Sequence, residues 1–501
     1  MKPLRELING FPNTLLQGDL GQEIAAIEYD SRQARPQSLF ICIRGGRHDG
    51  HRFIPDAARR GAVAFLVERD VRSAVGGPVP GTILQVEESR RALSHVATRF
   101  YDDASRDLCL TGITGTNGKT TVSYLAEAML RAGGHRVGVI GTIEYRCEGV
   151  SREAEQTTPE ASDLQALLRW MIEQGADAAI MEVSSHSLAL HRVAGCAFNV
   201  AVFTNLTQDH LDFHGTMEAY FEAKAQLFAL LREKGGTAVI NLDDPAGKRL
   251  REAMREPVVT YGLTAEADVT VAAPAYDLHG VRAQLRTPWG TGELRSPLLG
   301  RHNLYNCLAA LGVGGTLGVP VDRALESLAT VSHIPGRLEP VECGQPFKVV
   351  VDYAHTPDAL EWVLRSLREL CAGRLTVLFG CGGDRDRKKR PLMGEAAVQL
   401  ADRVFLTSDN PRSESPEAIL VEIEAGVRHV PGGMQRTALY VDRRQAIEAA
   451  LQEGRPNDII LIAGKGHERT QTVGQKVIPF DDREVARDVL QQLGYRGERG
   501  D

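Results

Sequence analysis

The stretch LTGITGTNGKTTVSYL, residues 110–125, decides the fold of this chain. An apolar lead-in is followed by a glycine-rich loop, by Lys119, Thr120 and Thr121, and then by apolar residues at helical spacing. This order of strand, loop and helix is typical of a phosphate-binding loop, in which backbone N–H groups and a helix N-terminus face an anion. Lys119 would reach the outer phosphates and a threonine hydroxyl would hold Mg²⁺. One departure is Ile113, which stands where the strict pattern has glycine.

Length and composition exclude several classes of protein. The chain has 501 residues, enough for about three domains, and its 43% apolar and 25% charged content is that of an ordinary globular protein. A net charge of −7 argues against a general nucleic-acid binder. Eight scattered cysteines without a CxxC pair indicate neither a disulfide framework nor a zinc site. Because no signal peptide or run of about 20 apolar residues is present, we expect a cytoplasmic protein without a membrane span.

Strands and helices alternate along most of the chain, which predicts an α/β fold with mostly parallel sheets. The run 268–298 differs, since its short alternating segments predict an antiparallel insertion. In the last third, four apolar strands end in polar loops that contain DYAHTP, GDRDRKKR, DNPR and GKGHE. Such loops gather at one edge of a doubly wound domain, where ligands bind. The basic run GDRDRKKR fits either an anion site or a solvated surface.

Polar residues also follow two predicted strands of the middle third. Glu182 ends the strand 178–183, at the position expected for a magnesium contact. Asp209, His210, Asp212 and His214 follow the next strand and suit either a hard metal or phosphate site, or the cap of the following helix.

Lys224 lies on an apolar face of a predicted helix that begins at Met217. A lysine in such a place usually extends to water. Near Mg²⁺ an ammonium group would be repelled, so a metal-binding role would need the charge to be reversed. Carbamylation by CO₂ would reverse it.

The motifs TGTNGKTT, MEVSSH, DHLDFHGTMEAYFEAK, DYAHTP, DNPR and GKGHE together resemble those of the Mur ligase family. They occur in order over nearly the whole chain. The resemblance implies three domains: 1–97 for a UDP-sugar, 98–336 as the central P-loop ATP-binding domain, and 337–501 as a Rossmann-like amino-acid-binding domain. We expect a monomer that binds no nucleic acid.

The resemblance also implies a reaction. ATP would phosphorylate a carboxylate of UDP-N-acetylmuramoyl-L-alanyl-D-glutamate, and the amine of meso-diaminopimelate would attack the acyl phosphate, as in peptidoglycan precursor biosynthesis. Phosphoryl transfer between anions needs cations around the γ-phosphate. The family binds one Mg²⁺ through positions that fall on Thr120 and Glu182, and a second through His210 and a carbamylated Lys224. Lys119, Glu182, His210 and Lys224 would be the catalytic residues.

Family matches supply the remaining candidate residues. For ATP they are Gly115, Thr116, Asn117, Gly118, Lys119, Thr120, Thr121, Asn303, Arg337 and Asp352. For the UDP-sugar substrate they are Ser31, Arg44, Gly45, Gly46, Thr158, Pro159, Ser184 and Arg192, while Leu190 replaces a glutamine that some members use. For the amino acid they are Arg385, Asp409, Asn410, Pro411, Arg412, Gly464 and Glu468.

The choice of amino acid rests on Arg412. meso-Diaminopimelate has a second amino-acid head at its far end, and a guanidinium matches the carboxylate of that head. L-Lysine ends in an ammonium instead, which a guanidinium repels. Glu468 would hold the far ammonium. The alternatives are an L-lysine-adding ligase, a family ligase that adds D-alanyl-D-alanine or glutamate, a P-loop switch or motor, and a binding protein without activity. Arg412 could also be a surface arginine at a helix start.

Overall fold

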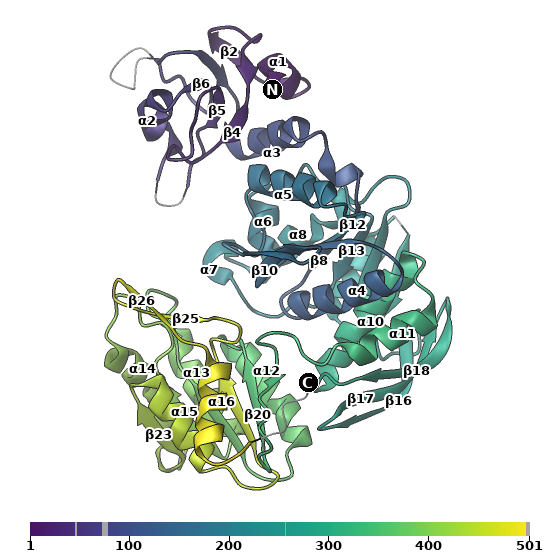
Figure 1. Ribbon diagram of the computed structural model, residues 1–501, viewed down its shortest axis with the longest axis vertical. Helices are drawn as coiled ribbons and strands as arrows, with labels where there is room; N and C mark the ends of the chain where they lie inside the picture. Colours follow the sequence, from purple (N-terminus) through teal and green to yellow (C-terminus); the bar gives the residue numbers. More distant parts are fainter. Residues whose placement is uncertain (46–47, 73–78, 256, 497–501) are drawn as a thin grey trace.

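Three α/β units follow one another in chain order along an arc in the computed structural model (Figure 1). It describes residues 1–45, 48–72, 79–255 and 257–496. The predicted α/β fold with three sheet-containing units is confirmed, and each unit has its own sheet. The proposed boundary at residue 97 falls inside helix α3 (Ser89–Phe100), which packs on helix α5 (Ala161–Glu173) of the central unit.

The first unit contains a five-stranded sheet in the order β2-β7-β6-β5-β4. Its elements are β1 (Lys2–Pro3), α1 (Leu4–Ile8), β2 (Thr14–Gln17), β3 (Glu23–Ile24), β4 (Ala26–Glu28), β5 (Ser38–Ile41), α2 (Ile54–Arg59), β6 (Ala62–Val67), β7 (Thr82–Gln85) and α3.

The central unit contains an eight-stranded sheet in the order β11-β10-β9-β12-β8-β13-β14-β15. Its strands are β8 (Cys109–Thr114), β9 (Val137–Ile140), β10 (Glu144–Cys147), β11 (Val150–Glu153), β12 (Ala178–Glu182), β13 (Val200–Phe203), β14 (Thr237–Asn241) and β15 (Val258–Tyr261). The six strands from β9 to β15 in that order are parallel, whereas β10 and β11 form an antiparallel edge hairpin. The sequence did not predict this hairpin, because β11 is exposed throughout and has no apolar periodicity.

The helices of the central unit are α4 (Lys119–Ala132), α5, α6 (Ser185–Ala189), α7 (Leu211–His214), α8 (Met217–Ala225), α9 (Pro245–Ala253), α10 (Arg301–Thr316) and α11 (Val321–Thr330). The predicted strand, loop and helix at residues 110–125 is confirmed as β8 followed by α4. The predicted antiparallel insertion is also confirmed, as strands β16 (Thr270–Asp277), β17 (Gly280–Thr287) and β18 (Gly290–Ser296).

The third unit contains a six-stranded sheet in the order β19-β20-β24-β21-β22-β23, in which all but β19 are parallel. Its elements are β19 (Glu339–Pro340), β20 (Lys348–Asp352), α12 (Pro357–Leu370), β21 (Leu375–Phe379), α13 (Lys389–Leu400), β22 (Arg403–Thr407), α14 (Pro416–Arg428), β23 (Thr437–Tyr440), α15 (Arg443–Gln452), β24 (Ile459–Ala463), the hairpin β25 (Thr470–Val473) and β26 (Lys476–Pro479), and α16 (Asp482–Gln492). In the described part of the chain, no helix is both long and apolar enough to span a membrane.

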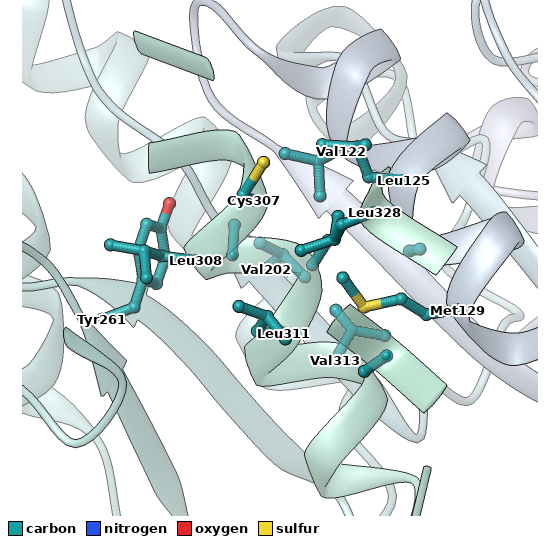
Figure 2. Close-up of a cluster of buried hydrophobic side chains, with 14 of the residues drawn as sticks. Val122, Leu125, Met129, Val202, Tyr261, Cys307, Leu308, Leu311, Val313 and Leu328 are labelled. Atoms are coloured by element: carbon teal, nitrogen blue, oxygen red, sulfur yellow. The ribbon is translucent and has the colours of Figure 1, made fainter. Parts of the chain in front are cut away.

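A buried apolar cluster fixes the helix that follows the glycine loop. Side chains of α4, β13, α10 and α11 meet there, among them Val122, Val202, Leu308 and Leu328 (Figure 2). All four are fully buried. Because close-packed side chains resist displacement, this cluster holds the N-terminus of α4 in place relative to the sheet.

Leu308→Ala should therefore lower the free energy of unfolding of the central unit by about 2–5 kcal/mol, the usual cost of such a core truncation. Leu392→Ala is the matched control, because Leu392 on α13 is 54% exposed. Thermal unfolding followed by circular dichroism would measure both variants. Equal melting temperatures for the two would contradict the role given to this cluster.

Candidate active site

The glycine loop needs glycine at two positions. Gly115 has a φ of 147°, and a Cβ there would lie 1.8 Å from Thr204 Oγ1. Gly118 has a φ of 89°, and a Cβ there would lie 2.5 Å from Asn306 Oδ1. Both φ values lie in the region that favours glycine, so backbone conformation and space impose the same requirement.

Gly115→Ala should therefore weaken ATP binding by about tenfold or more, since the loop must shift to relieve the clash. Gly134→Ala is the control, because Gly134 also has a positive φ (93°) but no atom within 4 Å of an added Cβ. Titration with a fluorescent ATP analogue would measure both. Equal effects of the two substitutions would show that strain alone, and not the Thr204 contact, matters.

Asn205 uses two of the loop's donors, which the sequence analysis did not foresee. The N–H of Thr116 donates to the Asn205 carbonyl oxygen at 2.9 Å, and the N–H of Asn117 donates to Asn205 Oδ1 at 2.9 Å. The donors left for an anion are therefore those at the start of α4, where the helix dipole also favours negative charge. Asn205 stands two residues after the end of strand β13, and that position was the only signal available in the sequence.

Lys119, Thr120 and Glu182 meet at the carboxyl ends of β8 and β12. Lys119 Nζ donates to the carbonyl oxygens of Gly115 at 3.0 Å and Thr116 at 2.9 Å. Burial lowers the pKa of Lys119. The Thr120 hydroxyl donates to Glu182 Oε2 at 3.0 Å. A hydroxyl and a carboxylate side by side are hard oxygen ligands of the kind that Mg²⁺ prefers.

Thr142 orients the Glu182 carboxylate and is a residue that the sequence analysis missed. Its N–H donates to Glu182 Oε1 at 2.9 Å and its hydroxyl donates to Oε2 at 3.0 Å. Glu182 is 1% exposed. These contacts fix the carboxylate next to Thr120.

Lys224 is buried, contrary to the usual behaviour of a lysine on an apolar helix face. It is 1% exposed, and its Nζ donates to the Gly115 carbonyl oxygen at 2.8 Å. Lys119 Nζ contacts the same oxygen. Burial and the neighbouring Lys119 charge together lower the pKa of Lys224 well below its ordinary value. Both effects disfavour the charged ammonium form of Lys224.

The polar residues after β13 do not form a metal cluster by themselves. In the described ranges, no three His, Cys, Asp or Glu side chains are grouped so that they could hold a metal ion. The interpretation of Asp209, His210, Asp212 and His214 as a joint metal site is therefore not supported. Instead His210 Nε2 lies 3.4 Å from Asp209 Oδ2, and its ring packs edge-on against His186 with ring centroids 4.7 Å apart.

A cleft of about 850 Å³ brings the central and third units together. Arg337 connects them, because its Nη2 donates to Thr120 Oγ1 at 3.3 Å and its guanidinium lies over the Tyr353 ring, 4.8 Å from the centroid. Asn303 also lines the cleft, and its Nδ2 donates to the Leu299 carbonyl oxygen at 2.8 Å. The cleft is also lined by His302, Tyr353, His355 and Trp362, of which Tyr353 and His355 belong to the DYAHTP motif.

Asp352 lines the cleft but is committed to the backbone. Its two carboxylate oxygens accept from the N–H groups of Leu338 and Ala354, each at 2.8 Å. Burial raises its pKa. Asp352 therefore holds the loop that carries Arg337.

The structure brings together only part of the residues predicted for the UDP-sugar substrate. Thr158 Oγ1 donates to the Glu182 carbonyl oxygen at 2.9 Å and accepts from the Ser184 N–H at 3.1 Å. Arg192 Nη1 donates to the Thr158 carbonyl oxygen at 3.0 Å.

The UDP-sugar candidates in the first unit make contacts separate from those of Thr158 and Arg192. Arg44 pairs with Glu68 at 3.2 Å, and the Gly45 N–H donates to the His48 carbonyl oxygen at 2.8 Å. Ser31 is buried and Gly46 lies outside the described residues. Within the described ranges, no hydrogen bond joins this group to Thr158 or Arg192.

The predicted amino-acid-binding residues gather at the carboxyl ends of β21, β22 and β24. Asn410 Nδ2 donates to Glu468 Oε2 at 2.8 Å. Gly464 has a φ of 110°, and a Cβ there would lie 2.7 Å from Asp409 Oδ2. Arg385 follows β21, Pro411 is buried beside Asn410, and none of the seven predicted residues is among those that line the cleft.

Arg412 is not a helix-start residue, because α14 begins at Pro416. It has a φ of 51°, which is unfavourable for any residue other than glycine. Its Nη1 donates to the Gly383 carbonyl oxygen at 2.8 Å, and its N–H donates to the Thr472 carbonyl oxygen at 3.0 Å. Backbone strain of this kind tends to persist where a side chain has a function.

Comparison with known proteins gives one consistent result. The sequence profiles of the Mur ligase family match at residues 23–101 (catalytic domain), 113–314 (middle domain) and 336–466 (glutamate ligase domain). The chain is 44% identical over 488 residues to the UDP-N-acetylmuramoyl-L-alanyl-D-glutamate–2,6-diaminopimelate ligase of Syntrophomonas wolfei, covering 97% of this chain and 99% of the relative. It is 46% identical over 476 residues to the Gloeobacter violaceus ligase of the same name, covering 95% of each. A solved structure of a ligase of that name superposes with a TM-score of 0.70 at 32% identity, over 98% of this chain and 99% of that one.

Proposed function

The chain belongs to the Mur ligase family, and we infer that it is the ATP-dependent ligase that adds 2,6-diaminopimelate to UDP-N-acetylmuramoyl-L-alanyl-D-glutamate in peptidoglycan precursor synthesis. The observation that carries this inference is the cleft between the central and third units. There the glycine loop, Glu182 and Arg337 surround a space large enough for a nucleotide. The reaction would take place in the cytoplasm, with the enzyme acting as a monomer.

The residues of the glycine loop fit the triphosphate of ATP. The loop excludes side chains at Gly115 and Gly118, and the first N–H groups of α4 have no partner within the helix. Lys119 would leave its loop carbonyls to contact the outer phosphates, while Thr120 and Glu182 would hold Mg²⁺. The ion would withdraw charge from the phosphates during transfer. Asn303, Arg337 and Asp352 would complete the nucleotide site from the other side of the cleft.

Lys224 fits carbamylation by CO₂. Its amine has a lowered pKa and shares an acceptor oxygen with Lys119, so a second ammonium is unfavourable there. Attack of the neutral amine on CO₂ forms an N–C bond, releases a proton and leaves an anion in place of the cation. Together with His210, that carbamate would hold a second Mg²⁺. This arrangement explains why a lysine occupies a buried position.

The acceptor pocket fits an amino acid with a zwitterionic far end. Arg412 would bind the far carboxylate of meso-diaminopimelate, and Glu468 would bind the far ammonium, with Asn410 between them. Arg385, Asp409, Pro411 and Gly464 would form the rest of the pocket. Thr158, Ser184 and Arg192 would hold the muramoyl dipeptide beside Glu182, with Ser31 and the Arg44–Gly46 loop on the uridine side.

In the proposed reaction, the glutamyl carboxylate takes the γ-phosphoryl group of ATP and releases ADP. The acceptor amine then attacks the acyl phosphate, loses a proton and displaces phosphate. The amide product keeps only one of the two oxygens of the glutamyl carboxylate, and the acyl-phosphate route requires the other to leave with phosphate. An isotope experiment therefore tests the route. With ¹⁸O in the glutamyl carboxylate, one ¹⁸O should appear in the released phosphate by mass spectrometry. Phosphate without ¹⁸O would contradict the acyl-phosphate route.

A further inference from the structure

Lys465 is a fully buried lysine next to the acceptor pocket, and it lies inside the GKGHE motif without a role assigned by the family resemblance. It lies in the loop after β24, between Gly464 and Glu468. Its side chain is 0% exposed, whereas that of Glu468 is 31% exposed. The lysine therefore stands behind the carboxylate, on the side away from solvent.

The ammonium group of Lys465 joins three parts of the pocket. It donates to Glu468 Oε2 at 3.0 Å, to the Thr470 carbonyl oxygen at 2.6 Å and to Asn410 Oδ1 at 3.4 Å. An ammonium has three donors, so these contacts use all of them. Lys465 is consequently placed to act on an amino acid through Glu468 and Asn410 and not by direct contact.

The two residues it holds are themselves coupled to the loop of Arg412. Asn410 Nδ2 donates to the same Glu468 oxygen at 2.8 Å, and Asn410 Oδ1 accepts from the Thr472 N–H at 2.9 Å. The neighbouring Thr472 carbonyl oxygen accepts from the Arg412 N–H at 3.0 Å. One oxygen of Glu468 thus has two donors from the protein, which fixes the direction of its other oxygen.

The charge of Lys465 also affects which amino acids the pocket can accept, because they differ in the group at their far end. A zwitterionic head brings a carboxylate to Arg412 together with an ammonium to Glu468, so each charge has a partner. A bare ammonium brings no carboxylate, so it would leave Arg412 unpaired and would add a positive charge to a pocket that already holds Arg412 and Lys465. Inside a protein, where screening is weak, such unpaired like charges are strongly unfavourable.

On the premise of the proposed function, we propose that Lys465 is a positioning residue that sets acceptor specificity. It holds Glu468 and Asn410 from behind, and its positive charge excludes acceptors whose far end is only an ammonium, such as L-lysine.

Steady-state kinetics of four enzymes would test this: the unmodified chain, Lys465→Met, Glu468→Gln and the double variant. Lys465→Met should raise KM for meso-diaminopimelate about tenfold with little change in kcat, as expected for losing a charged hydrogen bond. The ratio of kcat/KM for meso-diaminopimelate over L-lysine should fall by a similar factor, and KM for ATP should not change. In the Glu468→Gln background the same substitution should have much less effect, because coupled residues are not additive.

The control is Lys348→Met on β20, whose side chain pairs with Glu342 and which should behave like the unmodified enzyme. Independent, multiplicative effects of Lys465→Met and Glu468→Gln would overturn the proposal, as would equal losses for both acceptors. If Lys465→Met does not fold, Lys465→Gln replaces it, and unchanged discrimination in that variant would also overturn it. Failure of the unmodified enzyme to use meso-diaminopimelate would instead contradict the proposed function.

Discussion

Lys224→Ala should reduce ligase turnover by about 10³-fold, because the variant loses the group that would hold the second cation at the reacting phosphate. The loss should occur with little change in the affinity for ATP, since Thr142 and Thr120 hold Glu182 without Lys224, and Lys119 still contacts the Gly115 carbonyl oxygen. Short carboxylic acids such as acetate should restore part of the activity. They supply an anion of the right charge in the space that the shortened side chain leaves.

Lys224→Met separates this chemistry from packing. Methionine fills the volume between Tyr220 and the glycine loop but has no amine, so it should lose activity to the same extent and should not respond to acetate. Phosphate release with all three substrates present would measure both variants. Full activity in Lys224→Ala, or equal rescue of both variants, would remove the carbamate proposal.

Arg412→Gly should lower kcat/KM for meso-diaminopimelate by about 10²-fold, since a bidentate charged contact is lost. Stability should not fall, because glycine adopts a φ of 51° without strain and the backbone contacts with Thr472 and Gly474 remain possible. This combination distinguishes a binding role from a structural one.

Arg428→Ala is the control for Arg412, since Arg428 is an exposed arginine of the same unit that pairs with Glu424 on α14. It should leave the kinetics unchanged. Loss of melting temperature in Arg412→Gly in parallel with activity would indicate that Arg412 mainly supports the fold. Thermal unfolding and initial rates on the same preparations would decide.

The parts of this protein that local sequence determines were predicted well. The glycine loop and α4 form a contiguous pattern, and the parallel strands of the central sheet are continuous apolar runs. The hairpin β10–β11 was not predicted, because β10 has only four residues and β11 is exposed throughout and has no apolar periodicity.

Features of the site that depend on distant contacts could not be predicted from the residues alone. Lys224 is buried with its Nζ against the carbonyl oxygen of Gly115, which lies 109 residues earlier in the chain. Asn205 occupies the N–H groups of Thr116 and Asn117 across a similar separation. Arg412, whose backbone is left-handed, forms a bridge with Val473 of strand β25, 61 residues later in the chain. Family resemblance identified Lys224 and Arg412 as important, whereas the structure shows the contacts that each of them makes.

The measurement that tests this account most directly is phosphate release from ATP and Mg²⁺ with UDP-N-acetylmuramoyl-L-alanyl-D-glutamate, with meso-diaminopimelate and L-lysine compared as acceptors. We expect turnover with meso-diaminopimelate and almost none with L-lysine, because Arg412 pairs with the far carboxylate of the first and repels the far ammonium of the second. Turnover with L-lysine alone would contradict the role of Arg412. Phosphate release that does not depend on either acceptor would contradict the ligase function itself.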